Sequence, residues 1–445
     1  MVDLSAMDVS AQTITGDDAD YDELLKLIGE ARFVLLGEAS HGTQDFYHER
    51  ARITQRLILE KGFTAVAVEG DWPDAYRVNR YVCAQSNDET ADEALSGFNR
   101  FPTWMWRNTE VLKFVEWLRK HNDSSVPTMP KVGFYGIDLY SLFTSIDEVL
   151  KYLDVVDPDA AAHARARYAC FDRFDRSSEL YGYSQSVKGF PSSCEKPVMA
   201  QLVELYRKSD HYLAHEGSDA TDALFYAQQN ARLIKNAEEY YRNMFNPSVS
   251  SWNMRDQHMA EVLIHLDKHI TQGRSTPAKI IVWAHNSHLG DARATEMGER
   301  GELNVGQLMR QTYGSEVLSV GFTTYHGTVT AASDWGAPVQ RKKVRQALHR
   351  SYENYFHQIG RKSFYLPIKG NYLLHETLSY EQHLERAIGV IYSPETERQS
   401  HYFHANLSKQ FDAVIHIDQT NALKPLELTT HWVNGEAPET FPRGL

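Results

Sequence analysis

The stretch FVLLGEASHGTQDFYHER, residues 33–50, changes character at its middle. Four apolar residues with the pattern of a buried strand run into Gly37 and Glu38, and His41 follows three residues later. Apolar residues at helical spacing then occupy 45–62, ending at a glycine typical of a helix C-terminus. A strand that leads directly into a helix is half of a βαβ unit, so this stretch predicts an α/β fold.

The same alternation recurs along the chain. A second helix is predicted at 108–122, and several strand candidates are continuously apolar, which is typical of strands covered on both faces of a parallel sheet. The predicted architecture is a central, mostly parallel sheet flanked by helices. The expected strands are 33–38, 64–70, 131–139, 279–285, 316–322, 363–368, 387–392 and 411–418.

The middle of the chain differs, because residues 155–270 contain no convincing strand and read as long helices with short polar joints. We therefore expect a helical insertion or cap at 155–270. The first half of the α/β core, with the first active-site motifs, is expected at 1–154 and the second half at 271–445.

Composition narrows the possible partners. The 445 residues include 46 basic and 59 acidic side chains, a formal charge of −13, which argues against nucleic acid and anionic membranes as partners. No stretch approaches 18 apolar residues and the N-terminus has no signal-peptide pattern. Cys83, Cys170 and Cys194 are too few and too scattered for a disulfide framework or a zinc site, so we expect a reducing, cytoplasmic location.

Ionisable residues gather where predicted strands end. Ligands of open α/β sheets collect at the carboxyl ends of strands, so four such ends with acids or histidines predict one cleft. The residues concerned are Glu38 and His41, Glu69 and Asp71, Asp138, and His285, Asn286 and His288.

Each of these residues also has an ordinary structural explanation. A carboxylate near a helix start caps free N–H groups, and Arg50, beside Glu49, reads from spacing alone as a surface arginine. Trp104 and Trp106, beside Arg107, suggest the wall of a pocket, and Ser40 suggests a turn or cap residue. No G-x-S-x-G elbow lies at a strand end, and no Walker A, G-x-G-x-x-G or H-E-x-x-H motif occurs.

The motifs together resemble the erythromycin esterase family over about residues 30–428. They are GEASHGT, VAVEGDWPD, FPTWMWRNTEV, FYGIDLYSL, NMRDQHMAE, VWAHNSHLGD and FDAVIHIDQTNALKPL, in this order. The resemblance implies an α/β core with a large helical portion. It also implies hydrolysis of a lactone ester by water without an acyl-enzyme, and some members open macrolide rings in antibiotic resistance.

The resemblance assigns catalytic roles to Glu38, His41, Arg50, Glu69, His285 and His288. In the resulting hypothesis His41 is a general base on water, with Glu38 or Glu69 orienting its imidazole. His285, His288 and Arg50 would stabilise the oxyanion or protonate the leaving alkoxide. Substrate contacts are expected from Trp104, Trp106, Arg107 and Asp71.

This hypothesis makes the protein a carboxylic ester hydrolase with a small ester or lactone substrate and no metal or other cofactor. Two alternatives use the same residues. One is a metal-dependent hydrolase with the His/Glu cluster as ligands, and the other is a non-catalytic protein that binds a small molecule or haem. The sequence predicts no oligomeric state.

Overall fold

The computed structural model describes residues 4–126, 129–187, 193–215, 220–246, 250–272, 274–379 and 381–435. It divides into two compact units. Unit 1 comprises Met1–Val66, Tyr81–Val132 and Lys279–Leu445, and unit 2 comprises Ala67–Arg80 and Gly133–Ala278.

Unit 1 contains most of the central sheet, in the strand order β1-β8-β11-β6-β2-β5, with β7 paired to β6. Strands β5, β2, β6 and β11 are parallel to one another, whereas β1, β7 and β8 pair antiparallel. The strands are β1 Gln12–Thr13, β2 Phe33–Leu36, β5 Ile280–Trp283, β6 Val317–Ala331, β7 Gln340–Val344, β8 Ser363–Pro367 and β11 Ala413–Thr420.

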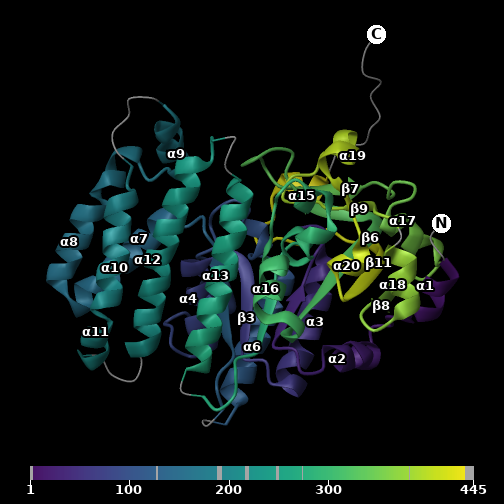
Figure 1. Cartoon of the computed structure of the whole chain (residues 1–445), viewed down its shortest axis with the longest axis horizontal. Coiled ribbons are helices and arrows are strands. Elements are labelled where there is room, and N and C mark those ends of the chain that lie inside the picture. The colour runs from purple at the N-terminus through teal and green to yellow at the C-terminus, as the bar shows by residue number, and fades with distance from the viewer. Residues whose placement is uncertain are drawn as a thin grey trace. The chain divides into compact units, whose positions relative to one another are not determined.

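Helices of unit 1 pack on this sheet; α3 contacts β11, and α17 contacts β6 and β11 (Figure 1). Helix α3 ends where the sequence predicts, because Gly62 adopts the left-handed conformation that terminates helices. The helices are α1 Leu4–Ser10, α2 Asp22–Ile28, α3 Gln44–Lys61, α5 Ala91–Leu95, α6 Thr109–Ser124, α14 Asn286–Leu289, α15 Glu296–Glu299, α16 Val305–Tyr313, α17 Tyr352–Gln358, α18 Tyr372–Ser379, α19 Glu397–Ser400, α20 Leu407–Gln410 and α21 Thr430–Asn434.

The prediction of a mostly parallel α/β sheet is thus confirmed, but the strand expected at 387–392 is wrong. The chain instead forms β9 His383–Arg386, paired antiparallel with β10 Tyr402–Ala405. Isolated bridges at Ile388 and Ile391 join the following segment to residues 40 and 332. The apolar pattern there indicates burial, but the backbone hydrogen bonds of this segment go to loops rather than to a neighbouring strand.

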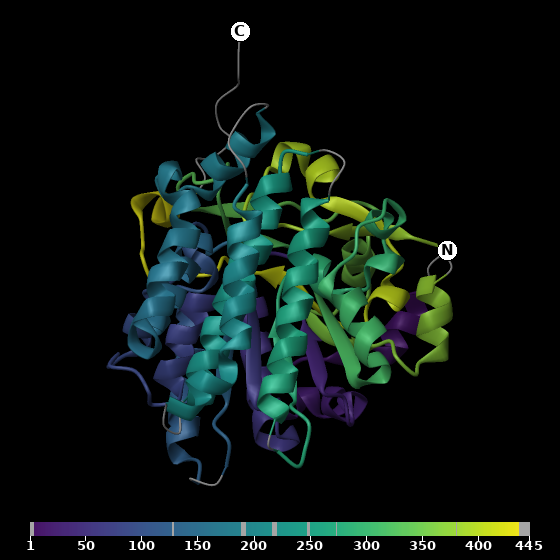
Figure 2. The ribbon, with the colours of Figure 1, turned by 60° about the vertical axis from the view of Figure 1, so that its left-hand side comes forward.

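Unit 2 is mainly helical, and the described residues between 158 and 271 contain helices and no strand. Helices α8, α10 and α12 run side by side (Figures 1 and 2), with α12 packed on α7, α10 and α13. The domain boundaries at 154 and 270 stay a prediction. The elements are β3 Ala65–Asp71, which begins in unit 1, α4 Trp72–Val82, which ends in unit 1, β4 Gly133–Asp138, α7 Leu142–Val156, α8 Pro158–Tyr168, α9 Ser178–Ser186, α10 Glu195–Arg207, α11 Ser209–His215, α12 Ala220–Asn243 and α13 Ser251–Thr271.

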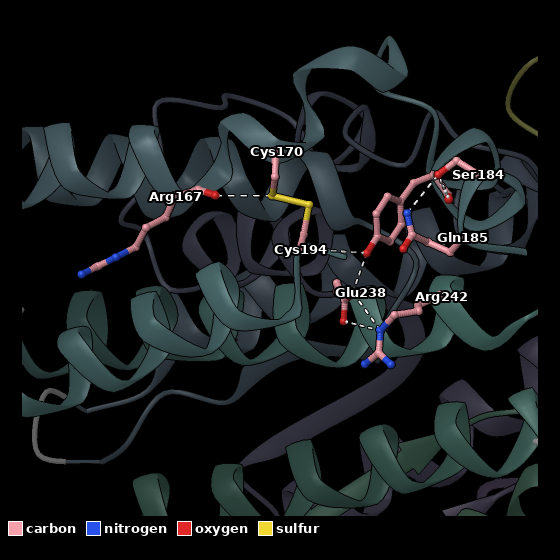
Figure 3. The surroundings of a disulfide bond; sticks show 8 residues. Arg167, Cys170, Ser184, Gln185, Cys194, Glu238 and Arg242 are labelled. Carbon is pink, nitrogen blue, oxygen red and sulfur yellow. Dashed lines mark hydrogen bonds and ion pairs between the residues drawn. A yellow bond between two sulfur atoms is a disulfide. The ribbon is translucent and has the colours of Figure 1, made fainter. Parts of the chain in front are cut away.

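A disulfide links Cys170 to Cys194 in unit 2, although the three cysteines had been considered too few and too scattered for a disulfide framework (Figure 3). The Cys194 backbone N–H donates to the Tyr181 hydroxyl, which in turn donates to Glu238, a partner of Arg242. The pairing could not be predicted from the sequence, because cysteines 24 residues apart meet only after the helices pack. Disulfides persist mainly in oxidising compartments, so the cytoplasmic location stays a prediction.

Reduction of this disulfide, or Cys170→Ser, is expected to destabilise the helical unit by about 3 kcal/mol, because a closed loop of this length restricts the unfolded chain. Thermal melting with and without reductant measures the effect. Cys83→Ser is the control, since Cys83 lies outside the disulfide. Identical melting of the parent and Cys170→Ser would show that the bond does not form in solution.

Candidate active site

The residues at the ends of β2 and β5 come together because of strand register. Leu36 pairs with Trp283, and Glu38 and His285 each follow two residues later. The Asn286 backbone N–H donates to the carbonyl oxygen of Glu38 at 2.8 Å, which joins the two strand ends. The expected convergence of these two ends is therefore observed within unit 1.

Glu38 lies between His41 and Arg50. Its Oε1 is 2.9 Å from His41 Nδ1, and its Oε2 accepts from Arg50 Nη2 at 3.0 Å. Glu38 is 1% exposed, His41 is 7% and Arg50 is fully buried. The spacing-based reading of Arg50 as a surface residue is wrong, because α3 turns that side chain inward against the Tyr47 and Trp283 rings.

The two histidines differ in how their Nδ1 atoms are used. His41 Nδ1 faces a carboxylate, so this atom carries the proton and donates. His285 is the N-cap of α14, and its Nδ1 accepts from the Ser287 backbone N–H at 3.2 Å and lies 2.8 Å from the Ser287 hydroxyl. An Nδ1 that accepts from the backbone leaves the proton of the neutral ring on Nε2. The two ring centroids are 5.0 Å apart.

Close approaches explain the glycines and the asparagine of these motifs. A Cβ at Gly37 would collide with the Asn286 side-chain oxygen, and one at Gly42 with the backbone of Thr330. Asn286 is fully buried and holds the Phe322 backbone, donating to its carbonyl at 2.7 Å and accepting from its N–H at 3.2 Å. Asn286 thereby ties α14 to β6.

The other predicted residues of unit 1 have contacts of their own. His288 is buried on α14, and its backbone N–H donates to the His285 carbonyl. Trp106 is buried edge-on to Tyr47, and Trp104 edge-on to Phe101. Arg107 pairs with Asp92 and Glu427. Ser40 is buried and hydrogen bonded to the Thr43 hydroxyl, as expected for a turn residue.

Unit 2 contains a second group of predicted strand-end residues. Arg255 of α13 donates to Glu69 Oε1 at 2.7 Å and to both oxygens of Asp138 at 2.9 and 2.7 Å. Asp71, at the end of the same strand as Glu69, is 5% exposed. We assigned no role to Arg255 from the sequence, although the motif NMRDQHMAE contains it. Its signal is its place on a helix, from which an arginine can neutralise strand-end acids.

Comparisons with known proteins show the family of this chain. The family model for erythromycin esterase matches residues 58–420. The chain belongs to the erythromycin esterase family. Erythromycin esterase type II of Escherichia coli is 23% identical over 70% of this chain and 73% of that protein, and the putative hydrolase YbfO of Bacillus subtilis is 21% identical over 70% and 69%.

Solved structures share the fold of this erythromycin esterase family member. A Bacillus cereus protein matches with a TM-score of 0.77 at 20% identity, covering 95% of this chain and 98% of that chain. A mutant erythromycin esterase in its open conformation matches with a TM-score of 0.67 at 19% identity, covering 93% and 96%. Family membership supports a hydrolase with a small-molecule substrate.

No described helix combines the length and the apolar character needed to cross a membrane. Within the part of the chain that the structure describes, no three His, Cys, Asp or Glu side chains are grouped so as to hold a metal ion.

Proposed function

We propose that this protein hydrolyses carboxylic esters or lactones by attack of a water molecule that His41 activates. The observation that carries the proposal is the contact between Glu38 Oε1 and His41 Nδ1 at 2.9 Å. A carboxylate on Nδ1 fixes the tautomer in which Nε2 is unprotonated and can take a proton from water. Water is a weak nucleophile until such a base is in place.

His285 supplies the complementary function. With the proton of its neutral ring on Nε2, it can donate a hydrogen bond to the oxyanion that forms when the ester carbonyl is attacked. A base and a donor on rings 5.0 Å apart match the two needs of ester hydrolysis, proton removal and charge stabilisation. Subsequent donation of the proton by His41 to the leaving alkoxide would restore the starting state.

Arg50 acts in this proposal as a positioning residue. It is fully buried between Tyr47 and Trp283, and its described hydrogen bond goes to Glu38, so it keeps the orienting carboxylate in place. This differs from the direct oxyanion role that the family resemblance suggested. Catalytic roles for Glu69 and His288, and substrate contacts from Trp104, Trp106, Arg107 and Asp71, stay predictions.

Hydrolysis assays with a panel of simple esters, lactones and macrolides test the proposal, with His41→Ala as the inactive reference. We expect turnover of at least one ester or lactone class by the parent and no acyl-enzyme in mass spectra of the turning-over protein, because the mechanism uses water directly. A trapped acyl group on Ser40, with activity abolished in Ser40→Ala, would contradict direct water attack. Turnover of macrolides would identify an antibiotic-resistance substrate.

Activity is expected to survive dialysis against a chelator. The Arg50 cation lies beside Glu38, where a divalent ion would be repelled. Elemental analysis of the purified protein accompanies the assay. About one zinc or manganese per chain, with activity lost on chelation and restored by that metal, would instead support the metal-dependent alternative.

A further inference from the structure

Glu385 is a buried carboxyl group to which the proposed mechanism gives no role. It lies in β9 with none of its surface exposed, and neither of its carboxyl oxygens makes a hydrogen bond of normal geometry among the described residues, although the side-chain amides of Gln410 and Asn286 lie close to it. An ionised carboxylate in such a place would carry the full cost of desolvation. A buried acid of this kind is therefore expected to be neutral, or to be kept ionised for a function.

The groups around Glu385 do not supply a cation to its carboxyl group. Glu353 and Tyr352 approach it from α17. The neighbouring Arg386 is already engaged, because its backbone N–H donates to Glu353 and its guanidinium to the Tyr402 hydroxyl of β10. Burial raises the pKa of Glu385 well above its usual range, and the Glu353 carboxylate raises it further.

Glu385 also lies close to Asn286, which belongs to the turn that carries His285. The side-chain amides of Gln410 and Asn286 lie against its carboxyl group, and each opposes the rise in its pKa. Gln410 packs under the same turn, since a Cβ at Gly290 would collide with it, and its side-chain oxygen is buried without a described partner. Three residues beyond Glu385, the Ile388 N–H donates to the Ala39 carbonyl at 2.8 Å, beside the loop that carries His41.

We propose that Glu385 is a proton-bearing positioning residue, whose neutral carboxyl group supports Asn286 and Gln410 beneath the His285 turn. The neutral group offers one O–H donor, suited to the Gln410 oxygen, and an acceptor oxygen, suited to an amide N–H of Asn286. Ionisation removes the donor and places an unpaired charge behind the turn. The inference rests on the proposed hydrolysis, because the turn positions the donor of that reaction.

The pH profile of ester turnover tests this role through Glu385→Gln, which has nearly the shape of the neutral acid but cannot ionise. At neutral pH we expect turnover within about threefold of the parent, because an amide retains a donor and an acceptor. The alkaline fall in kcat that Glu385 ionisation causes in the parent should be absent from this variant. Glu385→Leu should lower kcat by about tenfold or more, because Asn286 loses its support.

Glu381→Gln is the matched control, since Glu381 lies close by in the sequence and is exposed. It should reproduce the parent profile. An unchanged alkaline limb in Glu385→Gln would overturn the proposal. So would a loss of more than about 100-fold at every pH in a folded variant, because the ionised form would then be the functional one.

The dependence of protein stability on pH can be measured even if the parent hydrolyses no ester. It therefore tests this inference separately from the proposed function. The folded state binds a proton at Glu385 over the pH range between its ordinary pKa and its raised folded pKa. Over that range the parent should become less stable, relative to Glu385→Gln, as the pH rises. The ratio of the parent's unfolding constant to that of the variant should increase by at most about tenfold per pH unit. Parallel curves for the two proteins would show that Glu385 is ionised in the fold and overturn the proposal.

Discussion

Replacing His41 by alanine is expected to lower ester turnover by about 10²–10⁴-fold, the usual contribution of a positioned general base. In the proposed mechanism the imidazole supplies the Nε2 atom that receives the water proton, because Glu38 Oε1 lies on its Nδ1. The chain should remain folded, because the Glu38 carboxylate keeps its Arg50 partner. Steady-state kinetics and thermal melting on the same preparation measure both effects.

Two further variants make the His41 result specific. His41→Asn retains an N–H donor near Glu38 but not a base of suitable pKa, so it should melt like the parent and be as inactive as His41→Ala. Ser40→Ala removes the adjacent hydroxyl, whose described partner is Thr43, and should keep most of the activity. Activity of His41→Ala within about tenfold of the parent would remove His41 as the general base.

Two regularities of the sequence are sufficient to predict that Glu38, His41 and His285 lie close together. Apolar runs locate β2 and β5, and parallel register brings the residues that follow them to one edge. Glu38, His41 and His285 therefore meet as expected. The choice between Glu38 and Glu69 as the neighbour of His41 needed coordinates, which show Glu38 on Nδ1 and Glu69 paired with Arg255.

Burial was not predictable in the same way. Arg50 and Glu385 are ionisable residues in polar local sequence, yet both are fully buried. Their environments come from segments far away in the chain, Trp283 for Arg50 and Glu353 for Glu385. Periodicity reports which face of an element is apolar, but not which single polar side chain is enclosed by another element. The pairing of Cys170 with Cys194 was missed for the same reason.

Replacing Arg50 by methionine is expected to destabilise the protein by about 3–5 kcal/mol, because it leaves the buried Glu38 carboxylate without its cation. The Arg50–Glu38 contact is 3.0 Å long, and the two side chains are 0% and 1% exposed, so water cannot replace the lost partner. The variant should also lose most ester turnover, since Glu38 would move or take up a proton and no longer orient His41. Denaturant unfolding and kinetics measure the two losses.

A double variant separates stability from catalysis. Arg50→Met with Glu38→Gln removes both buried charges, so it should recover much of the stability that Arg50→Met loses while staying inactive, because His41 still lacks a carboxylate on Nδ1. Arg56→Met is the control on the same helix. Its partners Glu60 and Asp22 are 46% and 51% exposed, so its loss should stay within about 1 kcal/mol. If Arg50→Met were no more destabilising than Arg56→Met, the buried pair would not stabilise the fold. If the double variant regained turnover, Glu38 would not be the residue that orients His41.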